Sequence, residues 1–423
     1  MKRVLMLSDS ASLQDLNNRS NLNLLISMGC EIHVGCNFIS GNTTSPERVD
    51  AFLDELEDAG IRCHQLSFVP SLNPMEKQPD AEAEVRFLIK KYKYDLIHCL
   101  TLSALQCAGP AAQKYKIPVM ATTFGLPVHK RTPLYRRMYF MPKLRKAAGY
   151  ADVLVCCNSE DHQLAQKRLP AKNTVYIPGT GLDPYRFRAP EIDRYRMRDL
   201  MEMPQNAVTL ISMGPLTAEK NHQVIIKALA KLKRLDINYL ICGGGPEADN
   251  LYQLISRLHL EDRVHFARNR DDVASVLHSC DIFCLPSKSE GIGMPALEAM
   301  EAGLPLITSD VQGIKDFMVN GETGFMFSPN DVNGFVSGIE ALVEDKKLRL
   351  DMGDHNRVAA EKFYRGNTDS IMKKLYEEQL SEQPERKAVK VSVRKSAPAA
   401  QPDVPAPKKK AKAAKKASEK KIK

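Results

Sequence analysis

The chain has 423 residues, more than one hydrophobic core usually serves, and 43% of them are hydrophobic. Its formal net charge of +9 comes from one end, because residues 381–423 hold 14 basic and 4 acidic residues whereas residues 1–380 hold 46 and 47. This composition favours two nearly neutral folded domains with a basic appendage. The first apolar run, Val4–Leu7, is too short for a signal peptide, and no run is long enough to span a bilayer. Any membrane role is therefore expected to be peripheral.

Apolar runs in the first half alternate with longer amphipathic stretches, such as Leu16–Met28 and Ala81–Lys93, which are predicted to be helices. This alternation is typical of an α/β fold in which helices cover both faces of a parallel sheet. The predicted strands are Val4–Leu7, Glu31–Cys36, Asp95–Cys99, Val119–Thr122, Val153–Cys157 and Thr174–Ile177.

A break near residues 178–190 separates this block from a second series of the same kind. Pro178–Gly181 ends the first block, and Pro184 and Pro190 disfavour a helix interior after it. A helix is predicted over Asn221–Leu235. The strands predicted for the second series are Val208–Met213, Tyr239–Gly243, Val264–Ala267, Ile282–Leu285, Leu306–Ser309 and Gly324–Phe327. Two such domains would form a cleft at the carboxyl ends of their strands, where open α/β sheets bind ligands.

The ten cysteines occur singly or inside apolar runs, and none forms a Cys-x-x-Cys pair. Cys280 and Cys284 are not accompanied by a full set of zinc ligands. We expect buried free thiols in a reducing compartment, which favours a cytoplasmic location.

From Ser381 onward the chain consists mainly of lysine, alanine and proline. Such a segment buries too little apolar surface to offset the entropy of folding, so residues 381–423 are predicted to be a disordered tail. Its lysine clusters, Lys408–Lys412 and Lys415–Lys416, favour attraction to an anionic membrane surface, and nucleic acid is not excluded. A merely solubilising appendage is the alternative.

The most informative motif follows the predicted strand Ile282–Leu285 and reads Ser-Glu-Gly-Ile-Gly-Met-Pro-Ala-Leu-Glu-Ala-Met. Gly291 and Gly293 would let the backbone approach a ligand closely. Pro295 suits the first position of a helix that runs to Ala302. The free N–H groups at this helix start would face a diphosphate.

The two glutamates of this motif are candidate binding groups for a nucleotide-sugar. Glu290, before the glycines, is placed to accept hydrogen bonds from sugar hydroxyls. Glu298, one turn into the helix, is placed to bind the vicinal diol of a ribose. The alternative is that both side chains are exposed on the surface and bind no ligand.

This motif, with Glu290 and Glu298 separated by seven residues, resembles the signature of retaining, family-4-type glycosyltransferases of the GT-B fold. The resemblance covers most of residues 1–380 and is strongest over 205–330. Over residues 134–190 it is closest to bacterial capsule and exopolysaccharide transferases. Further segments that resemble the family are Asp183–Phe187, Glu219–His222, Pro305–Gly313 and Asn320–Phe325.

The resemblance implies two facing Rossmann-like domains with a cleft between them. An acceptor domain is expected over 1–183, a nucleotide-sugar donor domain over 184–360, and a helix over 361–380 that returns to the first domain. The tail, 381–423, follows. The last helix itself is predicted over Asn367–Leu380.

The resemblance also implies which residues form the site. Lys220 would contact the donor diphosphate, which fits a cation at the start of a helix, although a solvated lysine is the alternative. Lys220 and Glu290 are the expected catalytic residues. The expected donor-binding residues are Gly214, Lys220, Glu290, Gly291, Ile292, Gly293, Met294 and Glu298.

The chain departs from the family pattern at two positions. Pro215 stands where family members often have an arginine, so one diphosphate contact is missing. Phe124 stands where the family has a histidine near the donor sugar. His129 is nearby in sequence as a substitute, but an exposed loop histidine is the plainer interpretation.

No cofactor is expected beyond the donor substrate. The first strand is followed by Ser8–Ser12, which lacks glycine and so disfavours a nicotinamide or flavin site. Metal is also not expected, because no Asp-x-Asp pair stands at a strand end. The turn Gly243–Gly245 is interpreted as a packing turn, and Asp271-Asp272 as the cap of a helix over Val273–Ser279.

The function implied by the resemblance is a hexosyltransferase-type enzyme of cell-surface polysaccharide synthesis. It would move a sugar from a nucleotide-sugar, with UDP favoured, to a glycan or lipid-linked acceptor, without metal and with retention of configuration. No protein nucleophile is evident, which favours front-side substitution. Two alternatives stay open: an inactive GT-B homologue acting as a partner subunit, motivated by Phe124 and Pro215, and a polyanion-binding protein acting through its tail.

Overall fold

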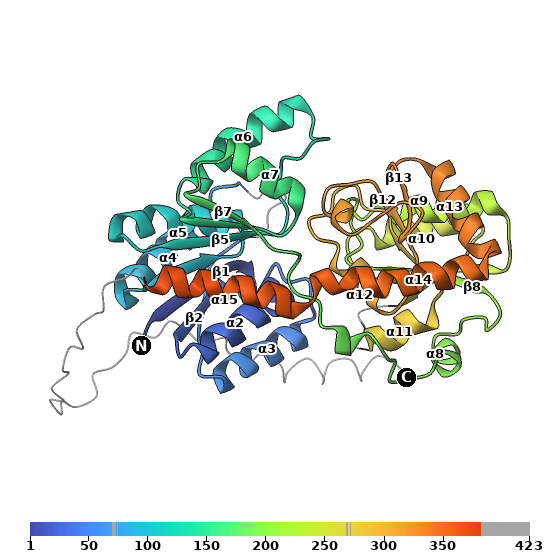
Figure 1. The fold of residues 1–423 in the computed structure, drawn as a ribbon, viewed down its shortest axis with the longest axis horizontal. Coiled ribbons are helices and arrows are strands. Elements are labelled where there is room, and N and C mark those ends of the chain that lie inside the picture. The colour runs from blue at the N-terminus through green and yellow to red at the C-terminus, as the bar shows by residue number, and fades with distance from the viewer. Residues whose placement is uncertain (70–72, 74, 268–269, 271, 382–423) are drawn as a thin grey trace, which may run out of the picture. The chain divides into compact units, whose positions relative to one another are not determined.

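The computed structural model describes residues 1–69, 73, 75–267, 270 and 272–381, and it contains two parallel β-sheets flanked by helices (Figure 1). The first sheet has the strand order β3-β2-β1-β4-β5-β6-β7 and the second has the order β10-β9-β8-β11-β12-β13. Every strand pair is parallel. The predicted α/β class, with two Rossmann-like domains, is confirmed.

The first sheet is built around β1, whose residues from Val4 to Ser8 are fully buried. Hydrogen bonds join β1 to β2 on one side and to β4 on the other. The strands are β1 (Arg3–Ser10), β2 (Glu31–Asn37), β3 (Arg62–Gln65), β4 (Leu96–Cys99), β5 (Val119–Thr123), β6 (Val153–Cys156) and β7 (Asn173–Tyr176). The helices are α1 (Ala11–Asn17), α2 (Arg19–Ser27), α3 (Pro46–Asp58), α4 (Pro79–Tyr92), α5 (Leu102–Tyr115), α6 (Leu134–Ala148) and α7 (Ser159–Arg168).

The single helix predicted over Leu16–Met28 is wrong. The structure has two helices there, α1 and α2, separated by Asn18, whose φ of −125° is not helical. Asn18 is fully buried, and its side-chain amide donates to Gln14 Oε1 at 2.7 Å. A polar side chain that bonds locally in this way competes with the helical backbone.

The second sheet is centred on β8 and β11, which are hydrogen-bonded neighbours. Its strands are β8 (Val208–Met213), β9 (Ile237–Cys242), β10 (Val264–Ala267), β11 (Ile282–Leu285), β12 (Leu306–Ser309) and β13 (Gly324–Phe327). The helices are α8 (Arg194–Leu200), α9 (Gln223–Leu232), α10 (Ala248–Arg257), α11 (Val273–Ser279), α12 (Met294–Glu301), α13 (Val332–Glu344) and α14 (Lys346–Ala360). Short 3₁₀ turns lie at Pro184–Arg186, Gly313–Asp316 and Glu361–Phe363.

Two local predictions in this half need correction. The helix predicted over Asn221–Leu235 is shorter at both ends, because Asn221 and Lys233 adopt left-handed φ values of 57° and 49°. Asp272 takes the N-cap position of α11, as predicted, but its carboxylate pairs with Arg270 and makes no cap hydrogen bond to the helix. Asp271, the other half of that prediction, lies outside the described residues.

The last helix, α15 (Arg365–Ser381), packs against α2, which belongs to the domain of the first sheet. Tyr376 is fully buried, and its hydroxyl lies 2.7 Å from His98 Nδ1 on β4. The other ring nitrogen of His98 lies 2.8 Å from Thr122 Oγ1 on β5. Burial lowers the pKa of His98 to about 3, so this bridge between α15 and the sheet is uncharged.

The cysteines are free, as predicted, and only Cys30 and Cys63 are not fully buried. No helix within the described ranges is long and apolar enough to cross a membrane. The predicted tail, apart from Ser381, lies outside the described residues.

Candidate functional site

The strand order of the second sheet sets the position of the candidate site. The chain reverses its direction of progress across this sheet between β8 and β11. In open α/β sheets such a switch point leaves a crevice at the carboxyl ends of the two strands. The loop after β8 carries Gly214 and Lys220, and the loop after β11 carries Glu290–Gly293. The strand order therefore brings together two segments that are remote in sequence.

Lys220 and Glu290 form an ion pair at this point. Lys220 Nζ lies 2.6 Å from Glu290 Oε2, and the exposed fractions of the two side chains are 18% and 12%. Ser287 Oγ donates to the same carboxylate oxygen at 3.0 Å. The sequence predicted a separate role for each residue, and the structure shows that the two side chains are in direct contact.

The backbones of the two loops are also tied together. Lys288 N–H donates to Glu219 O at 2.7 Å, next to Lys220. Asn221 is buried, and its side-chain amide donates to Pro286 O at 3.0 Å and to Pro329 O at 2.8 Å. The left-handed backbone at Asn221 aims this amide back at the second loop, so the Lys220 turn is held rigidly.

Gly214 passes close to the glycine-rich turn after β9. A Cβ on residue 243 would lie 2.0 Å from Gly214 O, and a Cβ on residue 245 would lie 2.5 Å from Leu216 O. Gly243–Gly245 is thus a packing turn, as predicted. Pro215 is exposed between these contacts and has no N–H to offer a ligand.

The motif after β11 leads into the N-terminus of α12. Gly293 precedes the helix with a left-handed φ of 74°, and Met294 takes the first helical position that the sequence assigned to Pro295. Ile292 is buried, Met294 is half-buried, and neither has a polar side chain, so they fix the loop by packing. The predicted helix is present, but it begins one residue earlier than predicted, so Pro295 takes its second position.

Glu298 lies one turn into α12 and is half-buried. Among the described residues, no side chain or backbone group donates a hydrogen bond to its carboxylate. Desolvation raises its pKa to about 7, against a small opposing effect of the Arg186 charge. A carboxylate with unused acceptor capacity is suited to a ligand that donates hydrogen bonds, and a vicinal diol is such a ligand.

Glu298→Gln is expected to remove a pH dependence of stability. A carboxyl whose folded-state pKa lies near 7, above its ordinary 4.5, stabilises the fold fully below pH 4.5. That stabilisation is lost as pH rises through 7, at a cost of up to about 3 kcal/mol. The variant should therefore gain stability relative to the natural chain between pH 5 and pH 8, as urea denaturation would measure. A constant difference over that pH range would contradict the raised pKa.

Phe124 approaches the motif through its backbone. A Cβ on residue 291 would lie 1.4 Å from Phe124 O, so only glycine fits there. Asn158 Nδ2, at the start of α7, donates to Gly291 O at 2.9 Å. On the other side, Gly313 N–H donates to Glu290 O at 3.0 Å. Residues from the loop after β5, the N-cap of α7 and the loop after β12 thus hold the Glu290–Gly291 segment in place.

The side chain of Phe124 is half-buried and packs against the hydrophobic core. It lines a small cavity together with Thr122, Thr180 and Met372. His129 is half-buried rather than exposed, and burial lowers its pKa. No contact among the described residues joins His129 to Lys220 or Glu290, so the structure gives a substitute role for His129 no support.

Sequence reasoning missed a polar group at the switch point of the first sheet, between β1 and β4. Asp9, at the end of β1, accepts hydrogen bonds from Thr101 Oγ1 at 2.7 Å and from Ser103 Oγ at 2.5 Å. Burial raises the pKa of Asp9. In the sequence, the segment Ser8–Ser12 indicated only that a nicotinamide or flavin site is disfavoured, because it lacks glycine. Asp9 could have been identified from the strand order of an α/β fold, which places the end of β1 beside the end of β4.

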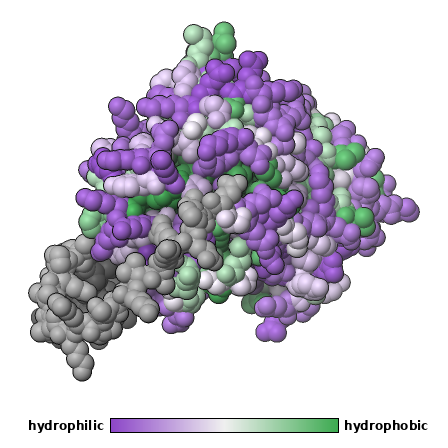
Figure 2. Space-filling view, turned by 60° about the vertical axis from the view of Figure 1, so that its left-hand side comes forward, coloured by the Kyte–Doolittle hydropathy of each residue, from purple (hydrophilic) through white to green (hydrophobic). Residues whose placement is uncertain are grey.

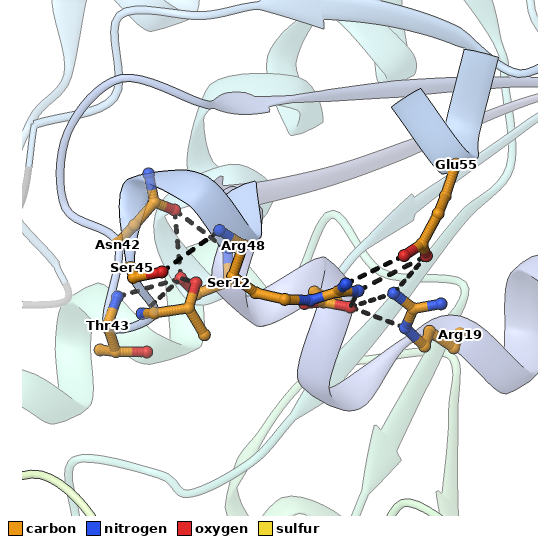
Figure 3. Close-up of polar contacts among 9 residues, drawn as sticks. Ser12, Arg19, Asn42, Thr43, Ser45, Arg48 and Glu55 are labelled. Atoms are coloured by element: carbon orange, nitrogen blue, oxygen red, sulfur yellow. Dashed lines mark hydrogen bonds and ion pairs between the residues drawn. The ribbon is translucent and has the colours of Figure 1, made fainter. Parts of the chain in front are cut away.

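A second polar network holds the loop after β1 (Figure 3). Ser12 N–H donates to Asn42 Oδ1 at 3.0 Å, and the hydroxyl of Ser12 accepts from Thr43 N–H at the same distance. Beside it, the carboxylate of Asp15 pairs with both Arg19 and Arg48, which also bind Glu55. The entry to α1 is thereby fixed against the loop before α3.

A separate cavity of about 570 Å³ lies between α9 and α10. Its lining includes Asn221 and His222, next to Lys220 in sequence, but neither Glu290 nor Glu298. This cavity thus lies beside the predicted donor residues Gly214 and Lys220 and is not lined by them.

Two family models match the chain. The model described as "Glycosyl transferase 4-like domain" matches residues 21–180, and the one described as "Glycosyl transferases group 1" matches residues 196–358. Together they cover the whole second sheet, the first sheet apart from β1, and both loops that carry Lys220 and Glu290.

Relatives and solved structures agree with these models. The chain is 27% identical over 369 residues to the putative glycosyltransferase EpsD of Bacillus subtilis, across 86% of this chain and 93% of EpsD. It is 26% identical to the UDP-Gal:alpha-D-GlcNAc-diphosphoundecaprenol alpha-1,3-galactosyltransferase of Escherichia coli, across 62% of this chain and 70% of that protein. The crystal structure of Anabaena HepE in complex with UDP and glucose superposes with a TM-score of 0.72 at 20% identity, across 90% of this chain and 100% of HepE. At that identity the likeness shows the fold.

Proposed function

This chain belongs to the family-4 glycosyltransferases of the GT-B fold, and from that premise we propose that it transfers a sugar from a UDP-sugar to a glycan or lipid-linked acceptor with retention of configuration. The observation that carries the proposal is the Lys220–Glu290 ion pair beside the start of α12. The Escherichia coli relative uses UDP-Gal and a diphosphoundecaprenol-linked acceptor, and HepE binds UDP, which supports the choice of UDP and of a lipid-linked acceptor.

Each residue of the candidate site has a role in the proposed reaction. As the sugar leaves, negative charge grows on the diphosphate, and Lys220 Nζ and the free N–H groups of α12 stabilise it. Glu290 accepts from a sugar hydroxyl while Lys220 holds its carboxylate in position. Glu298 accepts from the ribose diol. The proposal requires no metal ion, because Lys220 supplies the positive charge at the leaving group.

The mode of substitution follows from the state of Glu290. Its carboxylate already accepts hydrogen bonds from Lys220 and Ser287, which makes it a poor nucleophile. We therefore propose front-side substitution, in which a donor phosphate oxygen takes the proton of the attacking acceptor hydroxyl. The same arrangement favours a working enzyme over an inactive partner subunit, because the half-buried pair is intact despite Phe124 and Pro215.

Isothermal titration with UDP and with UDP-sugars would test the division of labour between the glutamates. Glu298→Gln should weaken the binding of both ligands about ten- to a hundredfold, the effect of losing hydrogen bonds to a charged group. Glu290→Gln should leave UDP binding near that of the natural chain and lower sugar transfer. Glu261→Gln, at an exposed position of the same domain, is the matched control.

Two results would count against the proposal. Equal loss of UDP and UDP-sugar binding in Glu290→Gln would remove its assignment to the sugar. UDP binding without hydrolysis or transfer of any UDP-sugar would favour the inactive homologue. The anomeric configuration of a product, read by nuclear magnetic resonance, decides retention directly.

A further inference from the structure

Helix α6 carries a continuous exposed face that the transfer reaction does not use. From Pro133 to Tyr139 every residue is exposed. The side chains of Leu134, Tyr135, Met138 and Tyr139, here called the α6 face, have exposed fractions of 72%, 72%, 69% and 49%. Four large apolar or aromatic side chains at adjacent positions form a patch, whereas single exposed ones need no explanation.

The other side of α6 packs against the domain. Phe140, Leu144, Ala147 and Ala148 are buried, so this side is fixed in the core of the first sheet. At 100° per residue the α6 face lies opposite these positions. About two turns further on, the same outward side carries Arg145 and Lys146, which are exposed. In Figure 2, green apolar side chains stand at the top of the view, where Figure 1 places α6.

The charge around the α6 face has one sign. Residues 130–146 include seven lysines and arginines and no acidic residue. Arg131 is paired with Asp310, but Arg136 and Lys146 stand in solvent beside the α6 face. Lys143 Nζ lies 3.7 Å from the centre of the Tyr139 ring, so cation and aromatic ring share one surface.

We propose that the α6 face docks on an anionic lipid bilayer. Leucine and methionine would enter the boundary between headgroups and acyl chains, tyrosine would sit at the headgroup level, and the cations would meet lipid phosphates. A nucleic acid would use the cations but would leave Leu134 and Met138 without a partner. A bilayer surface offers partners to both the apolar centre and the cationic edge of the α6 face.

The position of α6 gives the docking a consequence for transfer. The loop 124–133 runs directly from Phe124, whose carbonyl abuts Gly291, to the first turn of α6. Docking would therefore bring the bilayer next to the elements that hold the motif. The inference stands on the α6 face alone and does not depend on the identity of the donor.

The lack of tryptophan in the chain allows a selective test. In the full chain, Tyr135→Trp places a single fluorophore on the α6 face, and Tyr195→Trp places one on α8, where the exposed fraction of 69% is similar. Mixed phosphatidylcholine–phosphatidylglycerol vesicles should shift the emission of the Tyr135→Trp chain to shorter wavelength, and spin-labelled lipid should quench it. The Tyr195→Trp emission should not change. This readout reports α6 even where the basic tail also binds lipid.

A second pair of variants measures the contribution to binding. Leu134→Ser with Met138→Ser should weaken vesicle partitioning about tenfold, because two partly inserted apolar side chains are lost. Leu350→Ser with Val358→Ser, at exposed positions of α14, is the matched control and should bind like the natural chain. Thermal melting of both variants checks that the fold is kept.

Three results would overturn the proposal. The first is vesicle binding with unchanged Tyr135→Trp emission, which would assign the binding to another segment. The second is no binding to anionic vesicles at all. The third is an emission change produced equally by RNA, which would make the α6 face a polyanion site instead of a membrane one.

Discussion

Lys220→Ala is expected to lower kcat for sugar transfer about a hundred- to a thousandfold, the usual effect of removing one group that stabilises developing charge. The variant loses the cation that faces the leaving diphosphate. It also leaves the carboxylate of Glu290 without a charged partner in a site where only 12% of that side chain is exposed. Steady-state kinetics with UDP-sugar donors, together with thermal melting, would separate the loss of catalysis from the loss of stability.

The double variant Lys220→Ala with Glu290→Ala tests whether the two side chains act as one unit. Residues that work as a unit have strongly non-additive effects, so the double variant should be little worse than Lys220→Ala alone. Lys227→Ala, an exposed lysine on the helix that follows Lys220, should leave kcat unchanged. Multiplicative losses in the double variant would mean that the ion pair has no joint role in the reaction.

Most of the fold could be predicted because the buried parallel strands are strongly apolar. The predicted strands of both sheets are present within a few residues of their predicted bounds. The strand that the sequence did not reveal is β3, whose residues are Arg-Cys-His-Gln and which pairs only with β2 at the edge of its sheet. An edge strand can be polar, because one of its sides is not enclosed by neighbours.

Helix bounds were less predictable because single backbone conformations decide them. The apolar pattern continues past Asn18, yet its local hydrogen bond to Gln14 separates α1 from α2. Asn221 looks like the first residue of a helix, but its left-handed conformation delays α9 until Gln223. Neither conformation follows from hydrophobic periodicity, which reports burial and not φ.

The candidate site could be predicted in part. The motif after β11 identified the loop and the helix start, because glycine and proline have definite conformational preferences. The Lys220–Glu290 contact could not be predicted from spacing, because it depends on β8 and β11 being neighbours in the sheet. The same holds for Asp9 and Thr101, which meet because β1 lies beside β4.

Gly291→Ala is expected to abolish most sugar transfer, by about a hundredfold or more, while UDP binding falls much less. A Cβ at this position would lie 1.4 Å from Phe124 O, so the loop must move away from the Phe124 backbone. That movement would break the hydrogen bond from Asn158 to Gly291 O and shift Glu290 relative to the sugar. A misplacement of about 1 Å is enough for a hundredfold loss. Glu298 lies on α12 itself, beyond the disturbed loop, so nucleoside binding should persist.

Gly244→Ala provides the matched control in another glycine-rich loop of the same domain. A Cβ on residue 244 would have no atom within 4 Å, so this variant should transfer sugar and melt like the natural chain. Initial rates and UDP titrations of the two variants, made side by side, measure the effect of the Phe124 contact alone. A Gly291→Ala chain that transferred sugar at the natural rate would mean that Phe124 and Gly291 are apart during turnover. The backbone of Phe124 would then have no part in positioning Glu290, and the loop between β5 and α6 would not contribute to catalysis.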